Sequence, residues 1–270
     1  MFDKLIDKGF QIEFHSHAKA ILSVDFPAAI AELENVLAAL TIPVEEIIRS
    51  GGGETKGTQR LRRALSEAAW RKVNFIIEKT INGVRRESQS HEVDHVRDFD
   101  GRLIALEIEW NNKDPFFDRD LENFKRLHAE GAISVGVIIT RGRELQAGMY
   151  DLVRRYAEEK NIRRHDDLAK FGLSPTPRQR DAVAKRLARA NGAKTYGDVW
   201  ADHFVSDKYG SATTHWRKLE DRVHRGVGNP CPLLLIGLPI STITFGEPAA
   251  VVEALIEEGS GERLEAAPSE

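Results

Sequence analysis

The sequence contains a single cysteine, Cys231, in 270 residues. One thiol excludes an internal disulfide and any zinc site built from several cysteines. No apolar run approaches the roughly 18 residues that a membrane-spanning helix needs, and the N-terminal segment MFDKLIDKGFQ lacks the apolar core of a signal peptide. We therefore expect a soluble cytoplasmic protein.

A large excess of charge of one sign is also missing, because 39 basic residues oppose 42 acidic ones for a formal net charge of −3. The charge is nevertheless uneven. Residues 247–270 contain seven Glu and one Arg, whereas residues 49–72 contain seven basic and two acidic residues. Basic clusters are usually solvated helix faces, but several of them in one chain are also what a polyanion-binding surface needs. We expect one domain over residues 1–258 and a disordered acidic tail over residues 259–270.

The middle of the chain has the pattern of a βαβ unit. Apolar runs predict strands over residues 103–110 and 132–140, and the segment between them predicts a helix around residues 118–128. Another apolar run predicts a buried strand over residues 231–239, and the polar stretch at about 154–210 predicts a helical insertion. Together these elements predict an α/β fold in which helices flank a central sheet.

Two amphipathic helices are expected before this unit, over residues 26–40 and from about residue 58 to residue 72. The glycine-rich stretch SGGGETKG, residues 50–57, separates them. It does not match a phosphate-binding P-loop, because its Lys precedes the last Gly and no apolar strand leads into it. We interpret it as a flexible loop.

Two glutamates, Glu107 and Glu109, interrupt the otherwise apolar strand RLIALEIEW. Side chains alternate along a strand with period two, so both carboxylates point to the same face. A buried pair of like charges is costly unless a cation compensates it, and a divalent metal ion is the usual compensation. The alternative is an edge strand whose glutamates face water.

A third carboxylate precedes these two in the segment HEVDHVRDFDGR. The turn signal DFDG, residues 98–101, predicts a hairpin that brings Asp94 close to Glu107. Clusters of oxygen ligands suit Mg²⁺, which also binds phosphate oxygens. Two alternatives stay open: acidic triplets arise by chance in a chain with 42 acidic residues, and Asp94 could simply pair with a surface base such as Arg97.

Two histidines, His15 and His17 in EFHSH, would share a strand face and could begin a metal site of the amidohydrolase kind. That kind of site needs further His and Asp residues at strand ends around a barrel. Only one βαβ unit is clear here, so a polar strand face is the better interpretation.

The segments VDHV, LIALEIEW, DPFFDRDLENFKRLH and ISVGVIITRGRELQ, followed by LLLIGLP, resemble the type II restriction endonucleases of the BglII/BstYI group, a branch of the PD-(D/E)XK nuclease superfamily. The resemblance covers residues 92–146 well and residues 214–239 loosely. It implies a PD-(D/E)XK core with a central mixed sheet, and a homodimeric, Mg²⁺-dependent nuclease in which Mn²⁺ substitutes for Mg²⁺. It also implies double-strand cuts in DNA at a short palindromic site, and a cognate DNA methyltransferase in the same system but not in a stable complex.

The resemblance carries roles over to particular positions. Asp94 and Glu107 would be metal ligands, together with the backbone carbonyl of Ile108. Glu109 departs from the pattern, since the superfamily usually has Lys there and the named group has Gln. A glutamate at this position resembles BamHI and implies a general base. Glu67, on the helix before the hairpin, is a candidate for a fourth acidic group, with a solvent-exposed helix glutamate as the alternative.

Polar and basic residues in three segments are candidates for contacts with DNA, since affinity comes mainly from phosphate contacts and specificity from base edges. They are Gly52, Gly53, Glu54, Lys56, Gln59, Arg60 and Arg63 around the glycine-rich loop; Arg141, Arg143 and Gln146 after the second parallel strand; and Thr213, Thr214, His215, Arg217 and Lys218 before the last strand. Exposed bases in loops are also ordinary surface residues.

Sequence-specific double-strand cleavage is therefore the expected function. A structure-specific repair nuclease on the same fold is one alternative, and a DNA-binding module without catalysis is another. The recognition sequence cannot be read from these side chains, because one residue type permits several base assignments.

Overall fold

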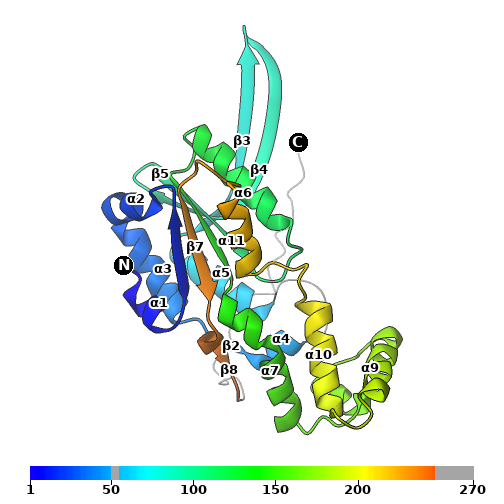
Figure 1. Cartoon of the computed structure of the whole chain (residues 1–270). Helices are drawn as coiled ribbons and strands as arrows, with labels where there is room; N and C mark the ends of the chain where they lie inside the picture. The colour runs from blue at the N-terminus through cyan, green and yellow to red at the C-terminus, as the bar shows by residue number, and fades with distance from the viewer. Residues whose placement is uncertain (50–54, 247–270) are drawn as a thin grey trace, which may run out of the picture.

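A six-stranded mixed sheet forms the centre of the protein in the computed structural model, which describes residues 1–49 and 55–246 (Figure 1). The strands lie in the order β1 (Gln11–His15), β7 (Leu233–Leu238), β6 (Val135–Arg141), β5 (Arg102–Glu109), β4 (Val84–Phe99) and β3 (Arg71–Ile81). Strands β5, β6 and β7 are parallel, and β1, β3 and β4 each pair antiparallel to their neighbours. The expected α/β class with a central mixed sheet flanked by helices is confirmed.

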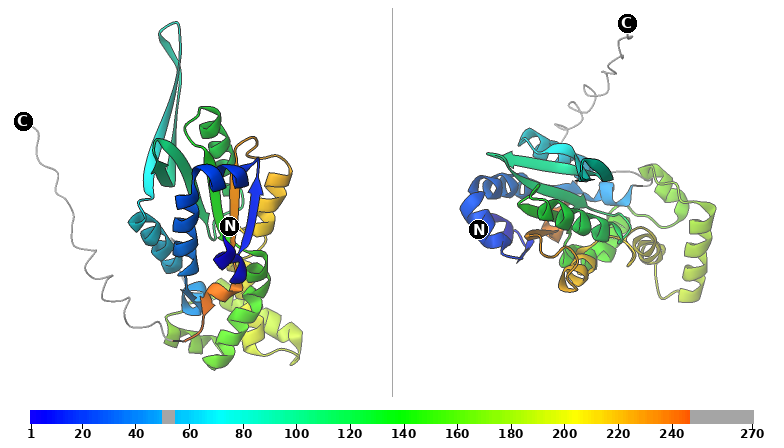
Figure 2. Two further views of the ribbon diagram at one scale, coloured as in Figure 1. Left: turned by 90° about the vertical axis from the view of Figure 1, so that its left-hand side faces the viewer. Right: turned by 90° about the horizontal axis from the view of Figure 1, so that it is seen from above.

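Helices cover both faces of this sheet (Figures 1 and 2). One face packs against α1 (Asp3–Asp7), α2 (Ala18–Asp25), α3 (Pro27–Ala38), α5 (Lys56–Glu67) and α7 (Arg143–Glu159). The other face packs against α6 (Phe116–Ala129) and α11 (Trp216–His224). Because β5 alternates, Ile104 and Leu106 belong to the first core and Ala105 belongs to the second.

The predicted βαβ unit is present as β5, α6 and β6. The register aligns Glu107 with Ile138 and Glu109 with Thr140 in a parallel pair. Every residue of β6 and of β7 is buried, as expected for strands that are covered on both faces. β5 and β6 are the two central strands of the six-stranded sheet, so a site at their ends can be buried.

A set of helices forms a separate lobe beside the sheet (Figure 1). This helical lobe, residues 165–208, contains α8 (His165–Leu168), the short helix η1 (Ala169–Phe171), α9 (Pro177–Ala190) and α10 (Tyr196–Lys208). Its apolar side chains form one buried cluster with those of α7 and of α4 (Val44–Ile48). The stretch at 154–210 is thus helical as expected. Its first residues belong to α7, which already begins at Arg143 in the core.

The chain after β7 adds a short helix and a small sheet. They are η2 (Ile240–Thr242), then β8 (Ile243–Thr244), which pairs parallel with β2 (Ile42–Pro43). Residues 259–270, expected to be a disordered tail, lie outside the described residues, as do Gly52, Gly53 and Glu54. In residues 1–49 and 55–246, no helix combines the length and the apolar character that crossing a membrane would require.

Two local expectations are wrong. The helix expected up to residue 72 ends at Glu67, because Ala69 adopts a left-handed backbone with φ of 65° and Lys72 already belongs to β3. His15 and His17 do not share a strand face. β1 ends at His15, and His17 takes a φ of 67° at the start of α2.

β4 begins at Val84, well before the segment HEVDHVRDFDGR from which the sequence predicts a hairpin, and it pairs with β3 in a second, longer hairpin. Its two strands rise out of the molecule as a ribbon (Figures 1 and 2). Asn82 and Gly83 at its tip both have positive φ, at 51° and 78°, which suits an Asn-Gly hairpin turn. We call residues 76–91 the arm.

Candidate active site

Glu107 and Glu109 lie on β5, and both side chains point to the face that α6 covers. Glu107 is 7% exposed and Glu109 is 2% exposed, so neither glutamate sits on a solvated edge. Asn112 Nδ2 donates a hydrogen bond to Glu109 Oε2 at 2.9 Å, and Thr140 Oγ1 donates to the backbone oxygen of Glu109 at 2.7 Å. The strand end is therefore fixed by its neighbours while Glu107 is left without a cationic partner among the described residues.

Helix α6 brings two charged residues to the glutamates that the sequence reasoning missed. Asp120 is 1% exposed, and Arg119 contacts its Oδ1 through Nη2 at 2.7 Å and Nε at 2.8 Å. Arg119 Nη2 is also 3.7 Å from Glu109 Oε1. The sequence did contain a sign of Asp120. The residue lies next to Leu121 on the inward face of the predicted helix, where a charged side chain is unusual.

Burial and mutual repulsion disfavour ionisation of these carboxylates. Burial raises the pKa of Glu107 to about 9, with further contributions from the negative charges of Asp120 and Asp94. Burial and the charge of Asp120 raise the pKa of Glu109 to about 8. Burial also raises the pKa of Asp120, although Arg119 opposes this effect. The cluster therefore has too little positive charge around it to hold three ionised carboxylates.

Asp94 lies at the edge of this cluster, on β4. Its backbone N–H donates to Glu107 Oε1 at 3.4 Å, so the hairpin does bring the two residues together. Its carboxylate is half-exposed and forms an ion pair with Lys72 Nζ at 3.1 Å. The partner of Asp94 is thus Lys72 of β3 and not Arg97, which binds Glu32 at 2.9 Å.

A bulge in β4 explains where Asp94 and the next residue, His95, point. Arg71 pairs with Val96 while Val73 pairs with Val93, so β4 has one residue more than β3 at this point. Such bulges redirect a side chain and are frequent next to active sites. The His95 ring is buried, and burial lowers its pKa to about 4.

The carboxylates fit a divalent cation by their chemistry and charge. Their ligand atoms are oxygens only, which is the set that Mg²⁺ prefers. Asp120 Oδ2 is buried and receives no N–H donor, and the nearby Glu109 carboxyl can satisfy it only by holding a proton. In the described part of the chain, however, no three His, Cys, Asp or Glu side chains are already arranged as metal ligands. Metal ligation by Asp94, Glu107 and the carbonyl of Ile108 stays a prediction.

Glu67 is not part of this cluster. It is exposed in the last turn of α5, and no contact joins it to Glu107 or Glu109 among the described residues. Its position matches the alternative, a solvent-exposed glutamate on a helix.

The candidate DNA-contact residues differ widely in exposure. Lys56, Gln59 and Arg63 are exposed on α5. Arg60 is partly buried and bound by Glu46, with nitrogen to oxygen distances of 2.6 and 2.9 Å, and by the carbonyl of Thr41.

Arg141 is fully buried, which corrects the expectation that it faces DNA. Its Nη2 donates to Thr213 Oγ1 at 2.8 Å and to the Thr214 carbonyl at 2.6 Å, so it ties β6 to the segment before α11. Thr214 and His215 are buried as well. The basic residue at the end of a buried strand therefore has a structural contact instead of a surface one.

The other members of these sets also have protein partners. Arg143 pairs with Glu220 at 2.7 Å, and Gln146 Nε2 donates to the Tyr209 carbonyl at 2.9 Å. Lys218 lies 3.3 Å from Asp114. Arg217 is exposed at the start of α11.

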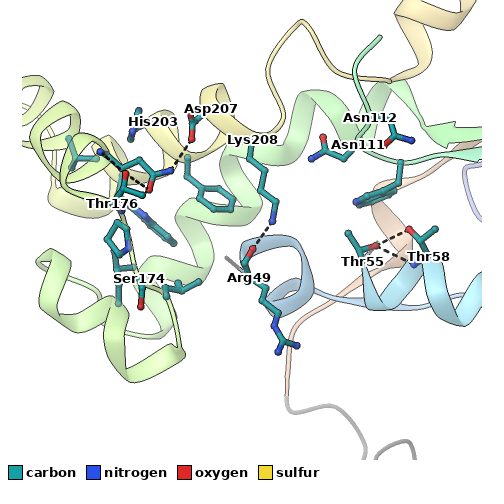
Figure 3. Close-up of a pocket in the computed structure, with 18 of the residues that line it drawn as sticks. Arg49, Thr55, Thr58, Asn111, Asn112, Ser174, Thr176, His203, Asp207 and Lys208 are labelled. Carbon is teal, nitrogen blue, oxygen red and sulfur yellow. Dashed lines mark hydrogen bonds between the residues drawn. The ribbon is translucent and has the colours of Figure 1, made fainter. Parts of the chain in front are cut away.

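A cleft of about 850 Å³ opens beside Asp94, between the sheet and the helical lobe. Figure 3 shows Thr55, Thr58 and Asn111 on the side of the sheet and Ser174 and Thr176 on the side of the lobe. Five basic residues and two acidic ones line it: Arg49, Arg62, Lys72, Arg180 and Lys208, with Asp94 and Asp207. The sequence reasoning did not predict a role for the lobe, because nothing in its polar composition shows which side faces the sheet.

Comparison with protein families gives one result that covers most of the chain. A family model described as "Restriction endonuclease BglII/BglIII" matches residues 10–238. This range contains Asp94, both strand glutamates, Asp120 and the helical lobe. A comparison with curated proteins found no match.

Proposed function

The chain belongs to the BglII/BglIII family of restriction endonucleases, and from this premise we propose that it makes Mg²⁺-dependent double-strand cuts in DNA at a short palindromic site. The membership implies a DNA-binding nuclease. The observation that supports the metal-dependent chemistry best is the group of buried carboxylates, Glu107, Glu109 and Asp120, which has too few positive partners of its own.

We assign the metal to Asp94, Glu107 and the backbone carbonyl of Ile108. A bound Mg²⁺ would polarise the scissile phosphate and neutralise the charge that develops there. Asp94 would have to leave Lys72, which lies 3.1 Å away and also pairs with Glu92 at 2.8 Å. A phosphate could then take the place of Asp94 beside the Lys72 ammonium. Mn²⁺ has similar ligand preferences and would substitute.

Glu109 is assigned as the general base. Asn112 holds its Oε2 at 2.9 Å, which fixes the orientation of the carboxylate. Because burial raises the pKa of Glu109 to about 8, its ionised form is a stronger base than an ordinary glutamate and would accept a proton from an attacking water. The water oxygen forms a bond to phosphorus, the bond to the 3′ oxygen breaks, and this oxygen takes up a proton from solvent, which leaves 5′-phosphate and 3′-hydroxyl ends.

DNA would reach the carboxylates past the basic cleft. Phosphate contacts supply most of the affinity of such proteins, and Arg180 and Lys208 on the lobe face the cleft from the side opposite to Lys72. Lys56 and Arg63 of α5 are exposed and could add phosphate contacts. A palindromic site is read by two copies related by a twofold axis, so we propose a homodimer on DNA. A cognate DNA methyltransferase would act in the same system without forming a stable complex.

The test is digestion of plasmid DNA by the full chain in Mg²⁺, followed by mapping of the ends. We expect discrete fragments whose ends share one short palindrome, and no cleavage in EDTA. Nicked or smeared products in Mg²⁺ would instead support a structure-specific nuclease. A shift of the duplex with no cleavage in Mg²⁺ or Mn²⁺ would leave only a DNA-binding module.

A further inference from the structure

Arg119 is the only arginine or lysine among the described residues that forms an ion pair with the buried carboxylate cluster. Both of its contacts to Asp120 fall on Oδ1, at 2.7 and 2.8 Å, and leave the buried Oδ2 without a cation. Its third contact reaches Glu109 Oε1 at 3.7 Å. The guanidinium therefore bridges the Asp120 and Glu109 carboxylates.

The side chain that makes these contacts is anchored loosely. Arg119 is 53% exposed, and its guanidinium carbon lies 4.4 Å from the centre of the Phe116 ring. Asp120 is buried, so withdrawing this side chain into water is costly unless another cation takes over the charge, which a divalent metal ion would do. The carboxylates, by contrast, belong to a buried strand and a buried helix face and cannot move away as easily.

We propose that Arg119, held on Asp120 and Glu109, is a tethered cation that competes with a divalent metal ion at Asp94 and Glu107 for the negative charge of the same carboxylate cluster, and so sets the metal concentration at which the site fills. A guanidinium and a divalent ion within a few ångströms of each other repel strongly in a poorly solvated site. Metal binding therefore displaces Arg119 from at least one of its carboxylates. This inference rests on the proposed metal-dependent function and names a residue that tunes it.

Two opposite effects of one substitution follow from competition. Replacing Arg119 by Met removes the charge and keeps an unbranched apolar side chain against Phe116. Without metal, the carboxylates lose their compensating cation, so the melting temperature in EDTA should fall. With metal, the competitor is gone, so the divalent ion should bind more tightly. A merely structural role for Arg119 predicts the first effect without the second.

The experiment measures Mn²⁺ binding to the full-length protein by isothermal titration calorimetry without DNA, together with the melting temperature in EDTA. For Arg119→Met we expect a Kd for Mn²⁺ that is lower by about threefold to tenfold, the range expected for loss of a partly exposed ion pair. Arg119→Lys keeps a charge but loses the planar fork, so its Kd should lie between those of the wild type and Arg119→Met.

Arg126→Met is the matched control. Arg126 lies two turns farther along α6 and binds Gln89 of the arm instead of the carboxylates. Its Kd for Mn²⁺ should stay within about twofold of wild type.

The outcomes separate the inference from the function on which it rests. If the wild type binds Mn²⁺ and Arg119→Met binds it equally or more weakly, the competition is overturned while the metal site stands. If the wild type binds no Mn²⁺ and cuts no DNA, both are overturned. Should Arg119→Met fold poorly, the Kd of Arg119→Lys decides, because competition predicts a lower value than in the wild type.

Discussion

One strand, β4, runs through two very different regions of this protein. Near the active site it lies between β3 and β5 under α6, and Val93 and Val96 are buried. In the arm it pairs with β3 alone, and Val84 is 52% exposed. The same residue type is thus core in one region and surface in the other. What differs is the presence of a third strand and a covering helix.

Charged residues show the same contrast. In the arm, Glu78 pairs with Arg85 at 2.7 Å, and both side chains are largely exposed. In the site, Glu107 is enclosed, and its pKa rises to about 9. Water and flexible partners satisfy a carboxylate in the arm, whereas burial makes the same group reactive and ready for a cation.

The largest expected difference between the two regions concerns cleavage. Glu107→Gln removes a proposed metal ligand, and we expect the cleavage rate in Mg²⁺ to fall at least about a hundredfold. Glu87→Gln makes the same chemical change in the exposed arm and should leave the rate within about twofold of wild type. Gel assays of plasmid cleavage measure both. Full activity of Glu107→Gln would remove this residue from the catalytic site.

A second comparison concerns how much a buried and an exposed isoleucine contribute to stability. Ile104 is fully buried in β5 and Ile76 is 63% exposed in β3. Ile104→Ala should lower the free energy of unfolding by about 2 to 5 kcal/mol, because it leaves a cavity in the core. Ile76→Ala should change it by about 0.5 kcal/mol or less. Urea unfolding followed by circular dichroism measures both values. Equal losses would mean that the arm is packed against something in solution.

The smallest expected effect is the part of the pH dependence of stability that Glu107 produces. The pKa of Glu107 is raised to about 9 in the fold from an unfolded value of about 4.3, so the folded state favours its protonated form. This contribution to stability is full below the unfolded pKa and is lost as the pH rises toward 9. In EDTA, the melting temperature of the wild type should therefore fall by a few degrees more than that of Glu107→Gln between pH 5 and pH 9.

The same titration affects the metal. Ligation requires the ionised carboxylate, so Mn²⁺ should bind more tightly as the pH rises through this range. If the melting temperatures of wild type and Glu107→Gln change equally between pH 5 and pH 9, Glu107 is already ionised near neutral pH.

Much of the fold was accessible from the sequence, because the strongest signals were local. The apolar runs predicted β5, β6 and β7, and the Asp-Gly turn predicted the hairpin that joins β4 to β5. The strand alternation also placed Glu107 and Glu109 on one face. The length of the arm was missed because residues 76–91 are mostly polar and bury little apolar surface.

The rest of the site required contacts between distant segments. Asp120 and Arg119 belong to a helix whose partner face is set by how α6 crosses the sheet. Arg141 looked like a surface base until the packing of α11 and the segment before it enclosed the side chain. Exposure of a charged residue depends on its neighbours in space, which a residue pattern does not specify.

By itself the sequence determined the central helices and strands, the shared strand face of Glu107 and Glu109, and the hairpin that carries Asp94. Each of these follows from backbone geometry over a few residues. Only the tertiary structure decided which charges are buried together. The closure of α6 over β5 encloses Glu107, Glu109 and Asp120 with a single arginine, and this desolvation, which no local pattern contains, is what raises their pKa values and prepares the site for a metal ion.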